Sequence, residues 1–347
     1  MTEPLDPNLW LEDVQGEAAL DWVRAHNARS QAELCARPEY ADFKPRLLAL
    51  LNSRERIPYV SRVGPHFYNF WQDAEHVRGL WRRTTLESYR QAEPEWDTVL
   101  DLDALGAVEG ENWVWHGSDT LSPAVPGGEW RRCLISLSRG GADATVVREF
   151  DLVDKRFLDA DDGGFTLPEA KSSAGWLDAD TLVVGTDFGP GSLTDSGYPR
   201  VIKRWRRGTP LSEAVTIHEG EASDVSAWVS VDDTPGFERV IHGRSVDFYT
   251  TEMWLVAADG ALQHLDKPAD ASLGFHEHWA VMELRSDLVQ GDTTHPAGAL
   301  LVAQADDLLA GHPQWTALFT PTPTRSLGGS TWTRGHVLLN VLDQVAN

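Results

Sequence analysis

The sequence of 347 residues has only two cysteines, Cys35 and Cys133. Two thiols cannot form a disulfide framework or a four-cysteine zinc site, so both are expected to be buried small apolar residues. No stretch approaches the roughly eighteen consecutive apolar residues of a membrane-spanning helix. The N-terminus "MTEPLDPNLW" also lacks the basic and apolar regions of a secretion signal. These absences predict a cytoplasmic protein without a membrane span.

Positive charge is scarce as well. The chain has 30 Lys and Arg against 53 Asp and Glu, a formal net charge of −23. Nucleic-acid binding requires a basic face, so a nucleic-acid partner is not expected. The basic cluster "KRWRRG", Lys203 to Gly208, alternates with Trp205 and is interpreted as the solvated face of an exposed strand.

A nucleophile elbow is missing too. That motif, Gly-x-Ser-x-Gly, needs glycines because the strained turn leaves no room for side chains beside the serine. In the nearest match, "GGSTW" around Ser330, tryptophan replaces the second glycine. His336 and Asp343 follow closely, but proximity in sequence does not build a triad, so Ser330 is expected to be a turn residue. The segment "GPGSLTDSG" around Ser192 is expected to be a polar loop. No catalytic residue is predicted.

Metal and cofactor signals are weak. His276 and His278 in "FHEH" could share a strand face at a period of two, but no third ligand can be named. "DADDGG", Asp159 to Gly164, resembles a calcium loop, although its glycine comes one place early and no helices flank it. A polar strand face and a tight acidic turn are the favoured interpretations. Since a glycine-rich phosphate cradle is also lacking, neither a metal nor a cofactor is predicted.

What the sequence does contain begins with two helical segments. Residues 16–36 combine good helix formers with an apolar stripe. A second helix is predicted over residues 43–53, with Pro45 acceptable only in its first turn. Residues 1–56 are therefore predicted to form a two-helix N-terminal arm.

Short strands follow from Ile57 onward. The segments "IPYVSRV", "HFYNFWQ", "VRGLWRRT" and "WDTVLDL" are rich in β-formers and are separated by turn-like stretches. Four consecutive strands with short connections predict an antiparallel meander. In a propeller, such a meander is one blade.

Tryptophan recurs through the rest of the chain, near a turn and an apolar strand each time: at Trp176, Trp228, Trp279 and Trp332, spaced by 52, 51 and 53 residues. An imperfect copy begins near Trp113. A fixed period of this size indicates a repeat architecture, and the strand content selects a β-propeller. The four tryptophans are predicted to occupy equivalent positions in successive blades.

The predicted fold class is thus mainly β, with a β-propeller over residues 57–347. Counting from Ile57 gives five blades and the first two strands of a sixth, or about five and a half blades. Half a blade leaves an unpaired edge and an open ring, which propellers normally avoid. The propeller is therefore expected to be incomplete at its C-terminus and the chain to be the front part of something longer.

The segment "DPNLWLEDVQGEAALDWVRAHN", Asp6 to Asn27, resembles the N-terminal signature of the prolyl oligopeptidase family of serine peptidases. In that family an acidic "DPY-x-WLED" segment precedes a helix ending near "A-x-N"; here Asn8 replaces the usual tyrosine. The similarity extends over essentially the whole chain. "HFYNFWQ", "LDLDAL" and "PEAKSSAGW" also lie where comparable family segments lie.

The resemblance implies a two-domain peptidase whose seven-bladed propeller caps an α/β-hydrolase domain and restricts entry to short peptides. It also implies that the N-terminal arm packs on the hydrolase domain. Trp10 and Leu11 would then be anchors for a domain beyond residue 347, and are expected to be exposed here or buried in a chain–chain contact. No triad residue can be transferred, because no position matches the catalytic motifs. Residue preference at the scissile bond differs among related oligopeptidases.

Three functions follow for consideration. The leading hypothesis is the substrate-gating propeller portion of a prolyl oligopeptidase-like serine peptidase that cleaves short peptides, with the chain alone inactive. The alternative is a stand-alone, non-enzymatic propeller that binds a protein or peptide. A metal-dependent propeller hydrolase such as a lactonase would need carboxylates converging around the axis, and the sequence does not assign them.

Overall fold

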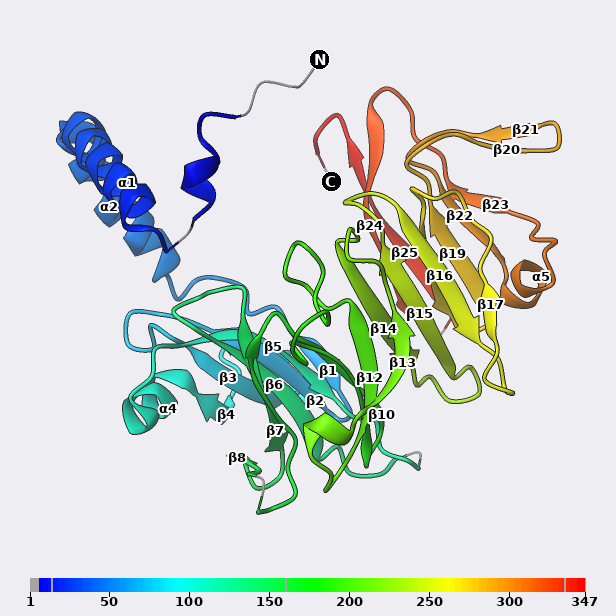
Figure 1. Cartoon of the computed structure of the whole chain (residues 1–347), viewed down its shortest axis with the longest axis horizontal. Helices are drawn as coiled ribbons and strands as arrows, with labels where there is room; N and C mark the ends of the chain where they lie inside the picture. Colours follow the sequence, from blue (N-terminus) through cyan, green and yellow to red (C-terminus); the bar gives the residue numbers. More distant parts are fainter. Residues whose placement is uncertain (1–5, 14, 126, 160, 334, 347) are drawn as a thin grey trace.

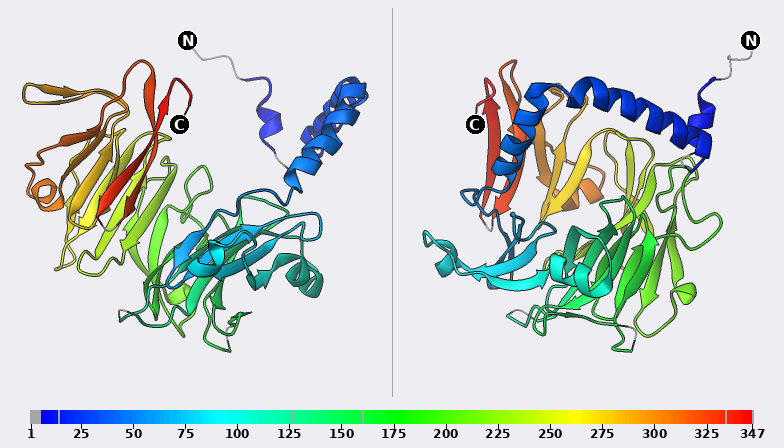
Figure 2. Two further views of the ribbon diagram at one scale, coloured as in Figure 1. Left: turned by 180° about the vertical axis from the view of Figure 1, so that it is seen from behind. Right: turned by 90° about the vertical axis from the view of Figure 1, so that its left-hand side faces the viewer.

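The computed structural model describes residues 6–13, 15–125, 127–159, 161–333 and 335–346 (Figure 1). Its described residues form five successive sheets of four or five strands, followed by a two-stranded sheet and accompanied by a few helices. Figure 2 shows the sheets arranged side by side in chain order, with the N-terminal helices outside them. The mainly β prediction is confirmed.

The first sheet contains the four predicted strands in the order β1-β2-β3-β4. They are β1 (Ser61–Val63), β2 (His66–Trp71), β3 (Leu80–Thr85) and β4 (Asp97–Asp101), all paired antiparallel. The turn between β1 and β2 places Gly64 at a φ of 57°, which a residue with a side chain rarely adopts. The sequence pattern therefore identified this unit correctly.

The next three sheets are also built from continuous stretches of chain. The second holds β5 (Trp113–Thr120), β6 (Arg132–Arg139), β7 (Thr145–Asp151), β8 (Arg156–Phe157) and β9 (Thr166–Ala170). The third holds β10 (Ser173–Asp178), β11 (Thr181–Gly185), β12 (Val201–Arg206) and β13 (Val215–Glu219). The fourth holds β14 (Ser226–Asp232), β15 (Arg239–Ser245), β16 (Thr251–Val256) and β17 (Leu262–His264).

The fifth sheet holds β18 (Ser272–His276), β19 (Trp279–Glu283), β22 (Leu300–Gln304) and β23 (Thr316–Phe319). A separate hairpin, β20 (Leu288–Gln290) with β21 (Thr293–His295), is inserted between β19 and β22. The last sheet pairs β24 (Arg325–Thr333) with β25 (His336–Asp343). Short helices connect some strands: α3 (Leu86–Tyr89), α4 (Leu102–Glu109) and α5 (Ala305–Leu309).

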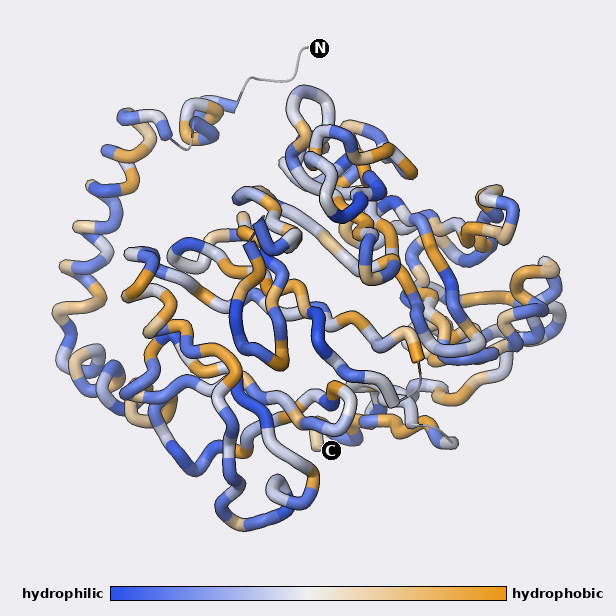
Figure 3. Tube along the Cα trace, turned by 90° about the horizontal axis from the view of Figure 1, so that it is seen from below, coloured by the Kyte–Doolittle hydropathy of each residue, from blue (hydrophilic) through white to orange (hydrophobic). Residues whose placement is uncertain are grey.

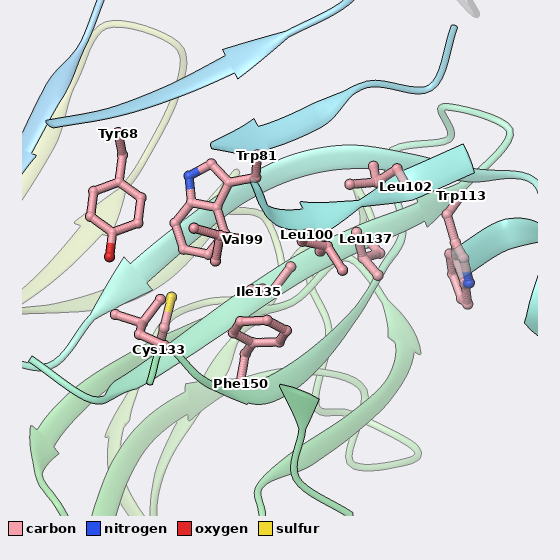
Figure 4. Packing of buried hydrophobic residues seen from close by; sticks show 11 residues of the cluster. Tyr68, Trp81, Val99, Leu100, Leu102, Trp113, Cys133, Ile135, Leu137 and Phe150 are labelled. Carbon is pink, nitrogen blue, oxygen red and sulfur yellow. The ribbon is translucent and has the colours of Figure 1, made fainter. Parts of the chain in front are cut away.

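The core lies between successive sheets rather than within one. Tyr68 and Trp81 of the first sheet share an apolar cluster with Ile135 and Phe150 of the second (Figure 4). A second cluster joins the second and third sheets in the same way. The first strands of neighbouring sheets also meet, since β5 contacts β10 and β10 contacts β14. Successive sheets packed face to face, with their first strands innermost, make this a β-propeller.

The tryptophan repeat agrees with this arrangement only in part. Trp176, Trp228 and Trp332 lie in the first strands of their sheets, but Trp279 lies in β19, the second strand. The prediction of equivalent positions is wrong for Trp279. In the fifth sheet the first strand carries Phe275, which packs against the cluster between the fourth and fifth sheets. The space between sheets requires a large apolar side chain, and phenylalanine meets that requirement as well as tryptophan does.

The N-terminal region contains α1 (Glu17–Ser30), a π-helical segment (Gln31–Cys35) and α2 (Pro38–Leu51). The second helix begins five residues before the predicted start, because Arg37 is extended and Pro38 occupies the first turn. Pro45 lies inside α2, so its predicted place in the first turn was wrong. Among the described residues, no helix is both long and apolar enough to cross a membrane.

Candidate functional site

The inner strands of the second and third sheets hold a desolvated carboxylate, Asp119. Asp119 lies near the end of β5, and its Oδ2 is 3.8 Å from where a Cβ would stand on Gly175 of β10. The indole Nε1 of Trp176 donates to the backbone oxygen of Asp119 at 3.0 Å. Desolvation raises the pKa of the Asp119 carboxyl, and the charge of Asp233, just after β14, raises it further. Both effects favour the protonated form of the Asp119 carboxyl.

A hollow of about 420 Å³ lies between the first and second sheets. Six aromatic residues make up half of its lining: Tyr59, Tyr68, Phe70, Trp81, Trp115 and Trp130. Its volume is typical of small-ligand pockets. The other lining residues are mostly polar: Ser61, Arg62, Asn69, Ser118 and Thr120, with Val63. The hollow is bordered by both inner strands, β1 and β5, so it lies on the inner side of these sheets.

The aromatic walls hold one another in place. Phe70 stacks on Trp115 with ring centroids 5.2 Å apart, and Trp81 lies 5.1 Å from both Trp115 and Tyr68. Figure 4 shows the Tyr68 and Trp81 rings side by side. Trp130 lies so close over Gly64 that a Cβ there would be 2.4 Å from the indole. The hollow is thus preformed by packing.

The sequence interpretation did not identify this hollow. Its signal was present as aromatic residues at a spacing of two in two separate strands, Tyr68 and Phe70 in β2 and Trp113 and Trp115 in β5. Such spacing places aromatic side chains on one face of a strand. The pairing of those two faces across different sheets is tertiary, so local patterns could not reveal it.

The structure keeps the serine candidate apart from its presumed partners. On the β24–β25 hairpin, Ser330 is opposite Leu339 and His336 is opposite Thr333, while Asp343 lies at the other end. At about 3.3 Å per residue, His336 and Asp343 are roughly 23 Å apart along the strand. The register therefore places His336 and Asp343 at opposite ends of β25.

The other candidate nucleophiles, a serine and two cysteines, have structural environments. The Ser192 hydroxyl donates to the Gly189 carbonyl at 2.7 Å and accepts from the Phe188 amide at 2.8 Å, so it fixes its own loop. Cys133 is fully buried as predicted, whereas Cys35 is only partly buried. Burial raises the pKa of the Cys133 thiol to about 12, which leaves it protonated and unreactive at neutral pH.

The suggested metal ligands do not converge. β18 ends at His276, so His278 falls in the following turn and the predicted shared strand face is wrong. The His276 ring lies 4.7 Å from Trp332, and the His278 ring 4.6 Å from Trp279. In the acidic turn, Ala160 lies outside the described residues, and Asp162 pairs with Arg156 at 2.5 Å. Within the described ranges, no group of three or more His, Cys, Asp or Glu could hold a metal.

The basic cluster is built as predicted. In β12 the Trp205 side chain is buried while Arg204 and Arg206 point to solvent. The last arginine, Arg207, is instead engaged with Glu149 of the second sheet. The cluster therefore contributes to packing between sheets through Trp205 and Arg207.

The N-terminal arm presents apolar side chains to solvent, in line with the expectation. Trp10 is 43% exposed, and no residue of α2 is buried. Leu47, Leu50 and Leu51 of α2 are 59%, 68% and 66% exposed. Figure 3 shows apolar positions recurring along these helices, which run apart from the sheets. Contiguous exposed apolar surface of this kind marks an interaction site.

The fold and its inner face define a β-propeller with a preformed aromatic hollow and, among the described residues, no catalytic triad. Residues 2–270 match the family model described as prolyl oligopeptidase, N-terminal β-propeller domain. The chain belongs to the prolyl oligopeptidase family.

Two curated relatives match nearly the whole chain. An uncharacterized peptidase of Sinorhizobium fredii, y4nA, is 37% identical over 359 residues, which cover 99% of this chain and 47% of that protein. An uncharacterized peptidase of Rickettsia prowazekii, RP174, is 28% identical, with 97% and 48% covered. The chain thus spans about half the length of the curated relatives it matches.

Solved structures give the same picture. A post-proline cleaving enzyme from Rickettsia typhi superposes with a TM-score of 0.83 at 27% identity, covering 96% of this chain and 50% of that one. Prolyl oligopeptidase B from Galerina marginata, bound to a 35-residue substrate, superposes with a TM-score of 0.61 at 14% identity, covering 98% and 49%. The second likeness concerns the fold alone.

Proposed function

We propose that this chain is the substrate-gating propeller portion of a prolyl oligopeptidase-like serine peptidase that cleaves short peptides. The observation that carries the proposal is the match of residues 2–270 to the propeller domain of that family, together with coverage of about half of each relative. The catalytic α/β-hydrolase domain would lie outside this sequence. We further infer a cytoplasmic location.

In this proposal, residues 1–56 form an arm and residues 57–347 form part of a seven-bladed propeller. The two-stranded β24–β25 sheet would be the beginning of a further blade. Residues in these two strands alternate between more and less exposed positions. This pattern is expected of a sheet whose inner face and outer edge would be covered by further strands. The exposed leucines of α2 would pack on the hydrolase domain or on a second chain.

The chemistry would be acyl transfer by a serine nucleophile, with histidine as base and an oxyanion hole, all supplied by the hydrolase domain. The propeller would contribute by excluding large proteins, since only a short, flexible chain can pass its inner face. Rigid packing between sheets supports this role, because a gate must keep its width.

A chimera tests the proposal. This chain replaces the matching half of the Sinorhizobium fredii relative, and hydrolysis of a short fluorogenic peptide is compared with hydrolysis of an unfolded protein of over a hundred residues. We expect cleavage of the peptide and protection of the long chain. Equal cleavage of both would refute gating. If the chimera is inactive but this chain alone binds peptides, the stand-alone binding propeller becomes the better function.

A further inference from the structure

Among the described residues that line the aromatic hollow, one is cationic; Arg82 and Arg83 lie behind the wall, where they donate to Asn69 and Tyr68. Arg62 of β1 borders the hollow, and its Nε donates to the Gly64 carbonyl at 3.0 Å. Across the described part of the chain, no carboxylate lies within ion-pair distance of Arg62. Most arginines on the neighbouring second-sheet surface do have such partners, for example Arg139 with Glu111 at 2.9 Å. The Arg62 guanidinium therefore keeps donors available for an anion from outside the chain.

Asn69, which lines the hollow together with Ser61, Ser118 and Thr120, already has its hydrogen bonds satisfied. The Asn69 amide donates to the Tyr59 carbonyl at 2.8 Å and accepts from Arg82 at 2.9 Å. Asn69 thus fixes Tyr59 at the edge of the hollow rather than offering a free hydrogen bond. The hollow combines six aromatic side chains with a few hydroxyl and amide groups, and Arg62 lies at its border. This combination suits a residue that carries a ring or other apolar group next to an anion.

The charge of the chain narrows the choice of anion. A net charge of −23 repels polyanions such as nucleotides and polyphosphates, whereas a single carboxylate meets far less repulsion. A C-terminal peptide residue with an apolar side chain has both required groups, because its side chain and its free carboxylate are attached to the same Cα atom. A guanidinium and a carboxylate can also form two parallel N–H···O hydrogen bonds with each other.

We infer that the aromatic hollow between the first and second sheets is a peptide-binding subsite, which takes the apolar C-terminal residue of a short peptide and pairs its carboxylate with Arg62. The inference rests on the proposed function, because it assumes that peptides reach the inner side of the propeller. Such a subsite would hold short peptides with free C-termini and disregard internal segments of long chains, which have no carboxylate at the required place.

The test measures binding to the purified chain by titration calorimetry. The probes are N-acetyl-Ala-Ala-Phe, its C-terminal amide and N-acetyl-Ala-Ala-Ala. We expect the acid to bind about tenfold more tightly than the amide, the usual effect of losing a charge-assisted hydrogen bond. The alanine peptide should also bind more weakly than the phenylalanine peptide, because it leaves the hollow unfilled.

Variants assign the site. Arg62→Gln should abolish the preference for the acid, while Arg90→Gln, a matched change at an exposed arginine, should keep it. Trp130→Ala should weaken both phenylalanine peptides. Ser61→Trp, which fills the hollow from an exposed position of β1, should abolish binding with an unchanged urea midpoint.

Three results would overturn the inference: no binding of any probe at millimolar concentration, an unchanged acid preference in Arg62→Gln, or full binding in Ser61→Trp. Loss of self-association in the same variants, measured by sedimentation, would assign the hollow to a second copy of the chain and also overturn it. The peptide-to-protein selectivity of the chimera tests gating separately. Failure of the subsite and failure of the proposed function are therefore distinguishable.

Discussion

Arg207, which follows β12 in the third sheet, donates two hydrogen bonds to the Glu149 carboxylate of β7 in the second sheet, at 2.7 and 3.1 Å. Glu149 is 0% exposed. Arg132 and the Phe165 amide also donate to it, at 2.5 and 3.0 Å. A carboxylate this deeply buried is tolerated only because these donors surround it. The pair ties two neighbouring sheets together.

Replacing Arg207 should therefore destabilise the propeller strongly. Arg207→Ala is expected to lower the free energy of unfolding by about 3 kcal/mol, because Glu149 stays buried with one cation fewer. Urea unfolding followed by tryptophan fluorescence measures the change. The control is Arg204→Ala on the exposed face of β12, which should stay within about 0.5 kcal/mol of the wild type. Equal effects in the two variants would contradict the role of the pair.

The contact between the third and fourth sheets predicts sensitivity to acid. His218 and His242 are both buried, with ring centroids 4.9 Å apart. Burial, and then the charge of His218, lower the pKa of His242 from 6.5 to about 4. As the pH falls, the unfolded chain takes up this proton first. Stability contributed by neutral His242 is complete above about pH 7, is lost between about pH 6.5 and 4, and is constant below that range.

His242→Phe should remove this loss, which amounts to about 3 kcal/mol across the range. Urea unfolding at pH 7, 5.5 and 4 gives the slope of the unfolding free energy against pH for the variant and for the wild type. The difference between the two slopes measures the loss, because the carboxylates titrate in both proteins and their contribution cancels. His312→Phe, at an exposed position, is the matched control and should retain the wild-type slope. A variant at position 242 that loses stability as steeply as the wild type would rule out this histidine as the source.

The arm predicts a contrast between surface and core leucines. Leu47→Lys together with Leu51→Lys should change the unfolding free energy of the chain by no more than about 0.5 kcal/mol, because both side chains already face water. Leu301→Ala, at a 0% exposed position, should cost about 2–5 kcal/mol. In the chimera, the double lysine variant should lower thermal stability, since charges would then face the hydrolase domain. Unchanged melting of the chimera would count against that contact.

The chain alone should have no peptidase activity. It is expected neither to hydrolyse prolyl or arginyl reporter peptides nor to react with a serine-directed phosphonate, because Ser330 has no adjacent base in the β24–β25 register. Mass spectrometry after incubation with the phosphonate gives a direct reading. Turnover that disappears in Ser330→Ala would show that the assignment of this chain as a gate without catalysis is mistaken.

Local patterns predicted much of the fold but little of the site. The strands of the first sheet were predictable because alternation and turn residues are short-range signals. Trp279 led to a wrong prediction. Its sequence spacing matches the tryptophan repeat, but it lies in the second strand of its sheet and the other three tryptophans lie in the first. The start of α2 was not predicted, because Pro38 begins the helix five residues before the apolar periodicity begins at Phe43. The hollow and the Glu149–Arg207 pair depend on segments from different sheets, and neither leaves a periodic trace in the sequence.

Each of the first four sheets is made from one uninterrupted stretch of chain, with the first complete by Asp101, the second by Ala170 and the third by Glu219. A polypeptide leaving the ribosome can therefore finish one sheet before the next has been synthesised, without waiting for distant partners. Each new sheet then meets an apolar face already prepared by its predecessor. The order of synthesis therefore sets the order in which the sheets assemble. A pause in translation between two sheets would leave a nascent chain whose completed sheets are already folded.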